Sequence, residues 1–186
     1  MRQYHFDEYL TYSDGTDHRY ELVAGQLRLV CWPTFRHLLL AKFIEQQLDA
    51  ETNRLGHPWL CLREVGLRTG WQKSRLSDVY VITTEQVVDM LDESAVCQTP
   101  PLLVVEVVSP ESVKRDYRYK RSEYAALGVP EYWIVDPLTS KVSVLQLNEG
   151  LYDEAEYRGE QAIASPTFPD LQLTVTQILR AGEPQQ

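Results

Sequence analysis

Cysteine and histidine are scarce in this sequence, and neither residue type forms a metal-binding or redox motif. The chain of 186 residues holds three cysteines and four histidines. The cysteines are odd in number and widely separated, so they contain no close pair of the kind found in zinc knuckles and redox sites. The histidines are equally scattered and lack metal-ligand spacing. We therefore expect free thiols and no zinc cofactor.

Long apolar runs are also missing. The chain begins MRQYHFD, without the apolar run of a signal peptide, and no segment approaches the ~20 uninterrupted apolar residues of a membrane span. We therefore expect a soluble, cytoplasmic protein with no membrane contact. With 44% hydrophobic and 24% charged residues, the composition matches one globular domain over residues 1–186, with a core large enough to fold unaided.

Positive charge is in short supply. The chain carries 18 Lys and Arg against 27 Asp and Glu, a formal net charge of −9. This balance argues against a protein that grips nucleic acid over its whole surface, because phosphate binding relies on Lys and Arg displacing counterions. The acidic excess is local, however: residues 148–186 hold seven acids and two bases, and residues 85–93 hold four acids and no base. The rest of the chain is neutral, which leaves room for a local basic patch.

The spacing of apolar residues predicts strands and helices along the whole chain. Residues 19–30 alternate in polarity and turn at Ala24-Gly25, which predicts a β-hairpin. Residues 34–48 repeat apolar side chains at helical spacing. A second helix is predicted from about residue 111 to residue 127, with Gly128 as its C-terminal cap. The other expected elements are strands at 59–67, 79–82, 132–135 and 141–147, a polar loop at 70–77, a short helix at 83–90, and a last helical turn at 174–180.

The centre of the sheet is predicted at residues 101–109, with the sequence PLLVVEVVS. Such a nearly continuous apolar run is typical of a strand covered on both faces. The order strand, helix, strand over residues 102–135 predicts a right-handed crossover. The predicted fold class is α/β, with a mixed β-sheet flanked by α-helices and additional β-hairpins at the N-terminal and C-terminal ends.

Glu106 is the strongest anomaly, because it lies inside this apolar run. An ionised carboxylate there loses hydration worth several kcal/mol unless something compensates. A metal ion, a lysine or a pocket mouth could supply the compensation, and the alternative is a partly exposed glutamate on an edge strand. Asp78 is expected at the entrance of a strand, directly before an apolar run. Without Glu106, an aspartate directly before a strand would usually be read as a turn residue.

Lys120 occupies a position that the helical pattern assigns to the apolar face. Val113, Tyr117, Tyr124 and Leu127 define that face, and Lys120 completes the stripe, so the lysine is predicted to point toward the sheet. It could instead extend outward to solvent, or pair locally with Asp116. An acid such as Glu106 opposite the lysine would lower the cost of its burial.

Two carboxylates on adjacent strands and one ammonium group suit metal-assisted phosphodiester hydrolysis. Hard oxygen ligands hold Mg²⁺ or Mn²⁺, which polarises the phosphate and lowers the pKa of bound water. A lysine can stabilise the developing negative charge or position the attacking water. Asp78, Glu106 and Lys120 are therefore the predicted catalytic residues, the first two as metal ligands.

Four further residues are assigned lesser roles. Glu21, in the first hairpin, is a second-tier acid near the metal. Lys114, Arg118 and Arg121 form a basic ridge on the 111–127 helix. Such a ridge is often only a solvated face, but in an acidic chain it is also the expected phosphate contact.

These residues resemble the pattern of the Uma2 family of restriction endonucleases, within the PD-(D/E)xK nuclease superfamily. The match extends from about residue 19 to residue 137, and the order and spacing of its parts make it specific. Its parts are Tyr20-Glu21-Leu22-Val23 with Gly25, Asp78-Val79, Glu106 to Pro110, Asp116, Lys120, Tyr124, and Gly128 to Pro137.

The resemblance implies a restriction-endonuclease-like core with Asp78 and Glu106 as metal ligands. Val108 stands where the superfamily pattern has its lysine, two positions after Glu106, and Lys120 on the following helix is the matching position. Ser77 replaces the usual proline before Asp78, a change that does not touch the metal chemistry.

Three functions compete at this point. The leading hypothesis is a magnesium-dependent DNA endonuclease, expected as a homodimer because two cuts in a duplex are most simply made by a dimer. The main alternative is a catalytically weak or inactive nuclease-fold protein that binds nucleic acid or a protein partner, which the acidic surface favours. A third is a dimeric interaction module that uses Trp32, Trp59, Trp71 and Trp133, provided that these are exposed together.

Overall fold

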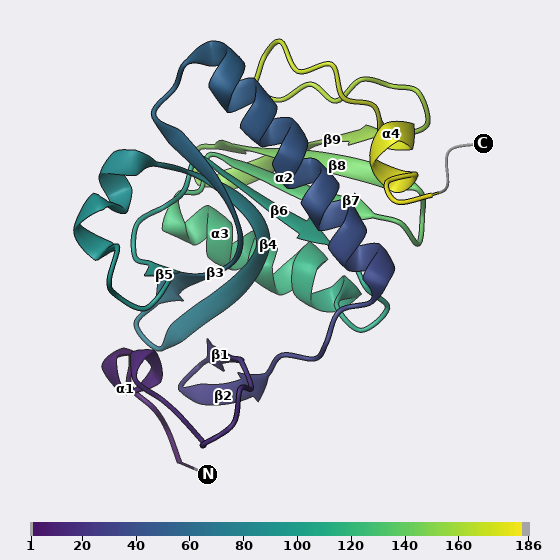
Figure 1. Ribbon diagram of the computed structural model, residues 1–186. Helices are drawn as coiled ribbons and strands as arrows, with labels where there is room; N and C mark the ends of the chain where they lie inside the picture. Colours follow the sequence, from purple (N-terminus) through teal and green to yellow (C-terminus); the bar gives the residue numbers. More distant parts are fainter. Residues whose placement is uncertain (1, 184–186) are drawn as a thin grey trace.

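The computed structural model describes residues 2–183, which form a mixed nine-stranded sheet with helices on both faces (Figure 1). The strands are β1 (Tyr20–Val23), β2 (Gln26–Leu29), β3 (Trp59–Gly70), β4 (Lys73–Thr83), β5 (Val96–Cys97), β6 (Leu103–Val107), β7 (Glu131–Asp136), β8 (Lys141–Asn148) and β9 (Leu151–Tyr157). The α-helices are α1 (Phe6–Leu10), α2 (Phe35–Leu55), α3 (Arg121–Leu127) and α4 (Val175–Leu179). Two 3₁₀ turns, η1 (Thr84–Gln86) and η2 (Val88–Met90), and a π-helical segment, η3 (Arg115–Lys120), complete the elements.

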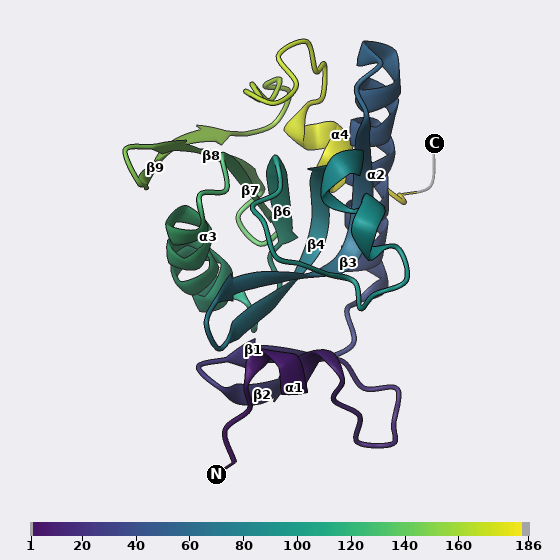
Figure 2. The same cartoon turned by 90° about the vertical axis from the view of Figure 1, so that its left-hand side faces the viewer.

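The sheet runs in the order β2-β1-β4-β6-β7-β8-β9, with β3 paired to β4 and β5 to β3. Most pairs are antiparallel, while β6–β7 and β3–β5 are parallel. Helix α2 covers one face and the η3–α3 helix covers the other, so that β4 and β6 lie between them (Figure 2). The predicted α/β class with a mixed sheet, and the extra hairpins β1–β2 and β8–β9, are confirmed.

The first hairpin forms where the sequence predicts it. Ala24 and Gly25 both have positive φ angles, 49° and 75°, as the tight turns that match strand twist require. Thr34 then caps α2 by accepting a hydrogen bond from the backbone N–H of His37, and Gly56 ends the helix in the left-handed region at φ 68°. The helix therefore extends seven residues beyond the predicted end at residue 48.

Strand β6 is the predicted central strand, and all five of its residues are buried. Alternate residues face opposite layers. Val105 and Val107 pack in the core beneath α2, with Ile44 and Trp133, whereas Val104 packs in the core that contains Tyr124 of α3. The parallel pairing of β6 with β7 through the η3–α3 helix confirms the predicted crossover connection.

Three local predictions are wrong. The expected polar loop at 70–77 is a tight turn followed by strand, because β4 begins at Lys73 and pairs with β3 along its length. Asp78 therefore lies inside β4 and not at its entrance. The expected helix at 83–90 is two 3₁₀ turns. The four tryptophans are not exposed together, since Trp133 is fully buried and donates its indole N–H to Glu131.

Within residues 2–183, none of the helices is both long enough and apolar enough to span a membrane.

Candidate active site

The site lies where two strands share one edge of β4. Strand β1 pairs with β4 at Ser74, and β6 pairs with the same strand at Val79, Tyr80 and Val81. Between these two ladders, residues 75–78 of β4 pair with neither β1 nor β6 on this edge, although β3 still pairs with β4 on its other edge. Buried backbone groups need hydrogen-bond partners, so this fork in the sheet must be filled by side chains.

Charged side chains supply those partners. The backbone N–H of Leu76 donates to Oε1 of Glu21 at 3.1 Å, and Nζ of Lys120 donates to the carbonyl oxygen of Leu76 at 2.8 Å. On the β6 side, the backbone N–H of Val107 donates to Oδ2 of Asp78 at 2.7 Å. The fork is therefore a polar gap in the sheet, lined by the predicted site residues.

Glu106 and Lys120 form a buried ion pair in this gap. Oε2 of Glu106 lies 2.7 Å from Nζ of Lys120, and both side chains are about 2% exposed. The hydroxyl of Tyr124 donates to the other carboxylate oxygen, Oε1, at 2.6 Å. Burial raises the pKa of Glu106 to about 8, against the opposing charge of Lys120. Burial by itself would lower the pKa of Lys120, but the surrounding acids outweigh it and raise that pKa, so the lysine is an ammonium ion.

Asp78 stands on the strand next to Glu106. Strands β4 and β6 pair in antiparallel register, with Val79 opposite Val105. One residue further along, the same register places Asp78 opposite Glu106. Burial tends to raise the pKa of Asp78, but the hydrogen bond and charge of His37 prevail and lower it. The side chains of Asp78 and His37 are 23% and 18% exposed, so they form the solvent-facing side of the site.

His37 is a site residue that the sequence prediction missed. Its Nε2 lies 2.9 Å from Oδ1 of Asp78. Although burial lowers the pKa of His37, the contact with Asp78 raises it by more. A signal was present, since His37 lies four residues before Ala41 and seven before Ile44, on the buried face of α2. It is a polar residue on an apolar stripe, as Lys120 is.

Glu21 and Asp116 complete the acidic surroundings of Lys120, at 3.8 and 3.9 Å from its Nζ. Glu21 is buried and accepts a hydrogen bond from Arg75 at 3.1 Å, and Arg75 also pairs with Glu123 of α3 at 2.7 Å. Arg75 thereby joins the first hairpin to the helix behind the site.

The predicted basic ridge is only partly free. Lys114 and Arg118 are exposed, and within residues 2–183 Arg118 makes no ion pair. Arg121 instead contacts Oε2 of Glu154 at 2.6 Å and the carbonyl oxygen of Tyr152 at 3.1 Å. The ridge therefore offers two exposed cations, of which Lys114 lies over the ring of Tyr119 at 5.5 Å from its centroid, while Arg121 is held by β9.

The donor atoms of the site suit a divalent cation. Asp78 and Glu106 offer hard carboxylate oxygens, and Oδ1 of Asp116 is buried with no hydrogen-bond partner. Burial raises the pKa of both Glu106 and Asp116, in spite of the cations Lys120 and Arg115 nearby, so a bound divalent cation would favour their charged forms. Among residues 2–183, no group of three or more His, Cys, Asp or Glu side chains is arranged to hold a metal. Magnesium commonly uses one or two carboxylates together with water and substrate phosphate, so the pair Asp78 and Glu106 fits such an ion.

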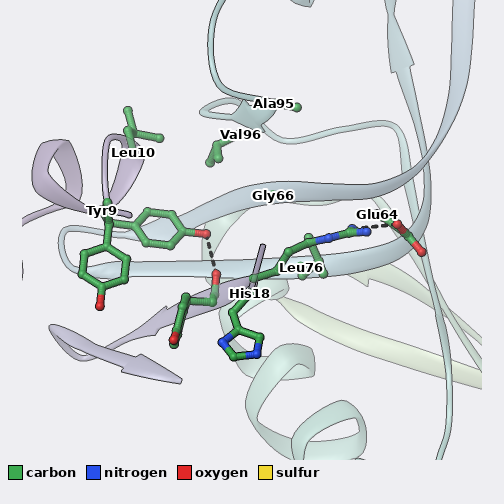
Figure 3. A pocket seen from close by; sticks show the side chains of 11 residues that line it. Tyr9, Leu10, His18, Glu64, Gly66, Leu76, Ala95 and Val96 are labelled. Carbon is green, nitrogen blue, oxygen red and sulfur yellow. Dashed lines mark hydrogen bonds and ion pairs between the residues drawn. The ribbon is translucent and has the colours of Figure 1, made fainter. Parts of the chain in front are cut away.

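A separate pocket of about 220 Å³ opens near the same strand (Figure 3). Tyr9, His18 and Tyr20 are among its lining residues, and the hydroxyl of Tyr9 donates to the carbonyl oxygen of Tyr20 at 2.9 Å. Leu76 also lines it, although its backbone contacts Glu21 and Lys120. Asp78, Glu106 and Lys120 do not line this pocket, which is distinct from the site.

Comparisons with known proteins bear on the family and the fold. The family model Uma2, described as "Putative restriction endonuclease", matches residues 6–176. A crystal structure titled as a putative nuclease belonging to DUF820, from Anabaena variabilis ATCC 29413, superposes with a TM-score of 0.77 at 15% identity and covers 93% of this chain and 96% of that one. The type IIG restriction endonuclease BpuSI matches with a TM-score of 0.43 at 10% identity, over 82% of this chain and 16% of its own. The first likeness shows a shared fold. No curated protein matches the sequence.

Proposed function

Because the chain belongs to the Uma2 family, we propose that it is a metal-dependent DNA endonuclease that hydrolyses phosphodiester bonds with Asp78, Glu106 and Lys120. The observation that carries the proposal is the buried Glu106–Lys120 pair beside Asp78, in a gap of the sheet. Burying a charged pair is costly. Hydrogen bonds to the backbone at the fork account for Glu21, Asp78 and Lys120. Both oxygens of Glu106 contact side chains instead, those of Lys120 and Tyr124, so satisfying the backbone does not explain this carboxyl.

Each side chain has a distinct task in this reaction. Asp78 and Glu106 would hold Mg²⁺ or Mn²⁺, and such an ion would supply polarisation of the scissile phosphate and activation of water. His37 orients Asp78, and Tyr124 orients Glu106. The Lys120 ammonium stabilises the negative charge that develops on the phosphate oxygens. Glu21 keeps this lysine charged from the hairpin side.

DNA is the proposed substrate, and the exposed cations Lys114 and Arg118 contact its backbone phosphates. We propose that a homodimer makes the two cuts of a duplex, and that the protein acts in the cytoplasm.

A second candidate is a nuclease-fold protein that binds nucleic acid, or a protein partner, without cutting it. The net charge of −9 favours this reading, because a strongly acidic surface weakens contact with DNA.

A plasmid assay distinguishes the two. Purified protein is incubated with supercoiled plasmid and Mg²⁺ or Mn²⁺, beside the variants Asp78→Asn, Glu106→Gln and Lys120→Met. The exposed acid Glu160 provides a matched control, Glu160→Gln. Cleavage by the wild type and the control but by none of the three variants supports the endonuclease. Cleavage that survives all three substitutions excludes this site, and DNA binding without cleavage by the wild type supports the second candidate.

A further inference from the structure

Asp116 carries a buried carboxylate oxygen that accepts no hydrogen bond, and Nε of Arg115 lies 3.5 Å from that oxygen. The residue is 1% exposed, and its Oδ1 is the one carboxylate oxygen among residues 2–183 that is buried and makes no hydrogen bond. An unsatisfied buried polar atom costs stability, so it calls for an explanation in terms of a missing ligand or a role. Asp116 is fixed in place, since its backbone carbonyl accepts a hydrogen bond from the hydroxyl of Tyr132 at 3.1 Å.

The unsatisfied oxygen faces the ammonium group of Lys120. Oδ1 of Asp116 lies 3.9 Å from Nζ of Lys120, too far for a direct hydrogen bond. An ammonium group has three donors, and the contacts of Lys120 to Glu106 and Leu76 engage at most two of them. One free donor and one free acceptor 3.9 Å apart are within reach of a single bridging water molecule.

The other ionisable groups of the site are engaged elsewhere, and Glu106, which holds a proton up to about pH 8, is proposed as a metal ligand. Both carboxylate oxygens of Asp78, Glu106 and Glu21 are engaged by protein partners. Lys120 is already protonated, and the Nε2 of His37 is committed to Asp78. Asp116 is the remaining carboxylate of the site, with an oxygen that accepts no hydrogen bond and lies 3.5 Å from Nε of Arg115.

We propose that Asp116 is the general base of the hydrolysis, and that it binds the attacking water jointly with Lys120. The proposal rests on the proposed endonuclease function. Oδ1 of Asp116 takes one proton from the water as the water oxygen forms a bond to phosphorus. The bond from phosphorus to the leaving oxygen breaks, and that oxygen takes a proton from solvent.

Two features of the chain suit Asp116 to this task. The π-helical segment η3 contains both Asp116 and Lys120, and π-turns often occur at functional sites. Burial raises the pKa of the Asp116 carboxyl, which makes it a stronger base than an ordinary aspartate.

The test compares the pH dependence of plasmid cleavage by wild type and Asp116→Asn. Asparagine keeps the size of the side chain and can hold a water molecule but cannot take its proton. At pH 7 we expect a loss of about 10²- to 10⁴-fold in cleavage rate, the usual contribution of a general base. Above pH 8 the difference in cleavage rate between wild type and Asp116→Asn becomes smaller, because hydroxide from solvent can replace the water that Asp116 deprotonates. The charged groups around Asp116 are His37, Asp78, Glu21, Glu106, Arg115 and Lys120. The charge of Asp116 raises the pKa values of His37, Glu106 and Lys120, so the substitution lowers these as well. The variant Glu21→Gln, which removes a neighbouring charge and leaves Asp116 in place, provides the control for this effect.

Binding measurements distinguish a base from a structural or metal-binding residue. The Mn²⁺-induced rise in melting temperature and the affinity for duplex DNA are expected to change less than threefold in Asp116→Asn. A deficit that is constant with pH, or that accompanies lost Mn²⁺ binding, overturns the assignment, as does cleavage within threefold of wild type at every pH. If the wild type and Asp116→Asn cleave plasmid equally well, the role of Asp116 as general base is refuted and the proposed endonuclease function stands. If the wild type cleaves nothing, both the endonuclease function and the role of Asp116 are refuted.

Discussion

Nζ of Lys120 on the η3–α3 helix lies 2.7 Å from Oε2 of Glu106 on β6, and both side chains are about 2% exposed. The two residues belong to separate elements, so the contact exists only when the helix is packed on the sheet. Each group supplies the charge that the other needs in a dry environment. Substitutions in the site therefore affect stability as well as activity.

Removing Lys120 should destabilise the protein most at pH values at which Glu106 is ionised. At pH 8.5, above the Glu106 pKa of about 8, we expect Lys120→Met to lower the free energy of unfolding by about 3 kcal/mol, because a buried carboxylate is left without its partner. Adding Glu106→Gln should recover part of the loss. Urea denaturation measures both, with the exposed Lys42→Met as control. Equal stability of wild type and Lys120→Met would show that the pair is not coupled.

Stability should fall as the pH rises from 4.5 to 8. Glu106 holds its proton up to about pH 8 in the folded protein, whereas an ordinary glutamate loses it near 4.5. In this window unfolding releases a proton, so each pH unit lowers stability by about 1.4 kcal/mol at most. Glu106→Gln should flatten this slope in urea titrations. His37 and Asp116 also have raised pKa values, and both residues remain in the variant, so some pH dependence of stability persists there. If stability falls equally steeply with pH in wild type and Glu106→Gln, the raised pKa of Glu106 is contradicted.

Metal binding should strengthen with pH. A ligand carboxylate must lose its proton before it binds a cation, and the raised pKa of Glu106 delays that loss. We expect Mn²⁺ to raise the melting temperature more at pH 8.5 than at pH 6.5. Asp78→Asn should abolish the effect, while Glu160→Gln retains it. The same melting shift in Asp78→Asn would remove Asp78 from the set of metal ligands.

Arg118 and Arg121 should differ in their contribution to DNA binding, although both lie on the predicted basic ridge. Arg118 is exposed, whereas Arg121 is held by Glu154 at 2.6 Å. Arg118→Ala should weaken binding and reduce the slope of log affinity against log salt by about 1. Arg121→Ala should leave that slope unchanged. Fluorescence anisotropy with duplex DNA, without divalent metal, provides the measurement, and equal effects of the two substitutions would argue against this phosphate contact.

Much of the fold could be predicted because its signals are local. The turn at Ala24-Gly25 needs positive φ angles, and the apolar run around Glu106 needs burial on both faces. The polar start of β4 misled the prediction, since residues 73–77 are strand only because β3 pairs with them. Similarly, the contact of His37 with Asp78 depends on the packing of α2 against β4.

The sequence by itself determined which charged residues are out of place: Glu106 in an apolar strand and Lys120 on an apolar helical stripe. Only the tertiary structure decided their partners and left Oδ1 of Asp116 without a hydrogen bond. The physical reason is that burial penalises a charge wherever it occurs in the sequence, whereas the distance between two charges depends on strand register and on how the helix packs on the sheet.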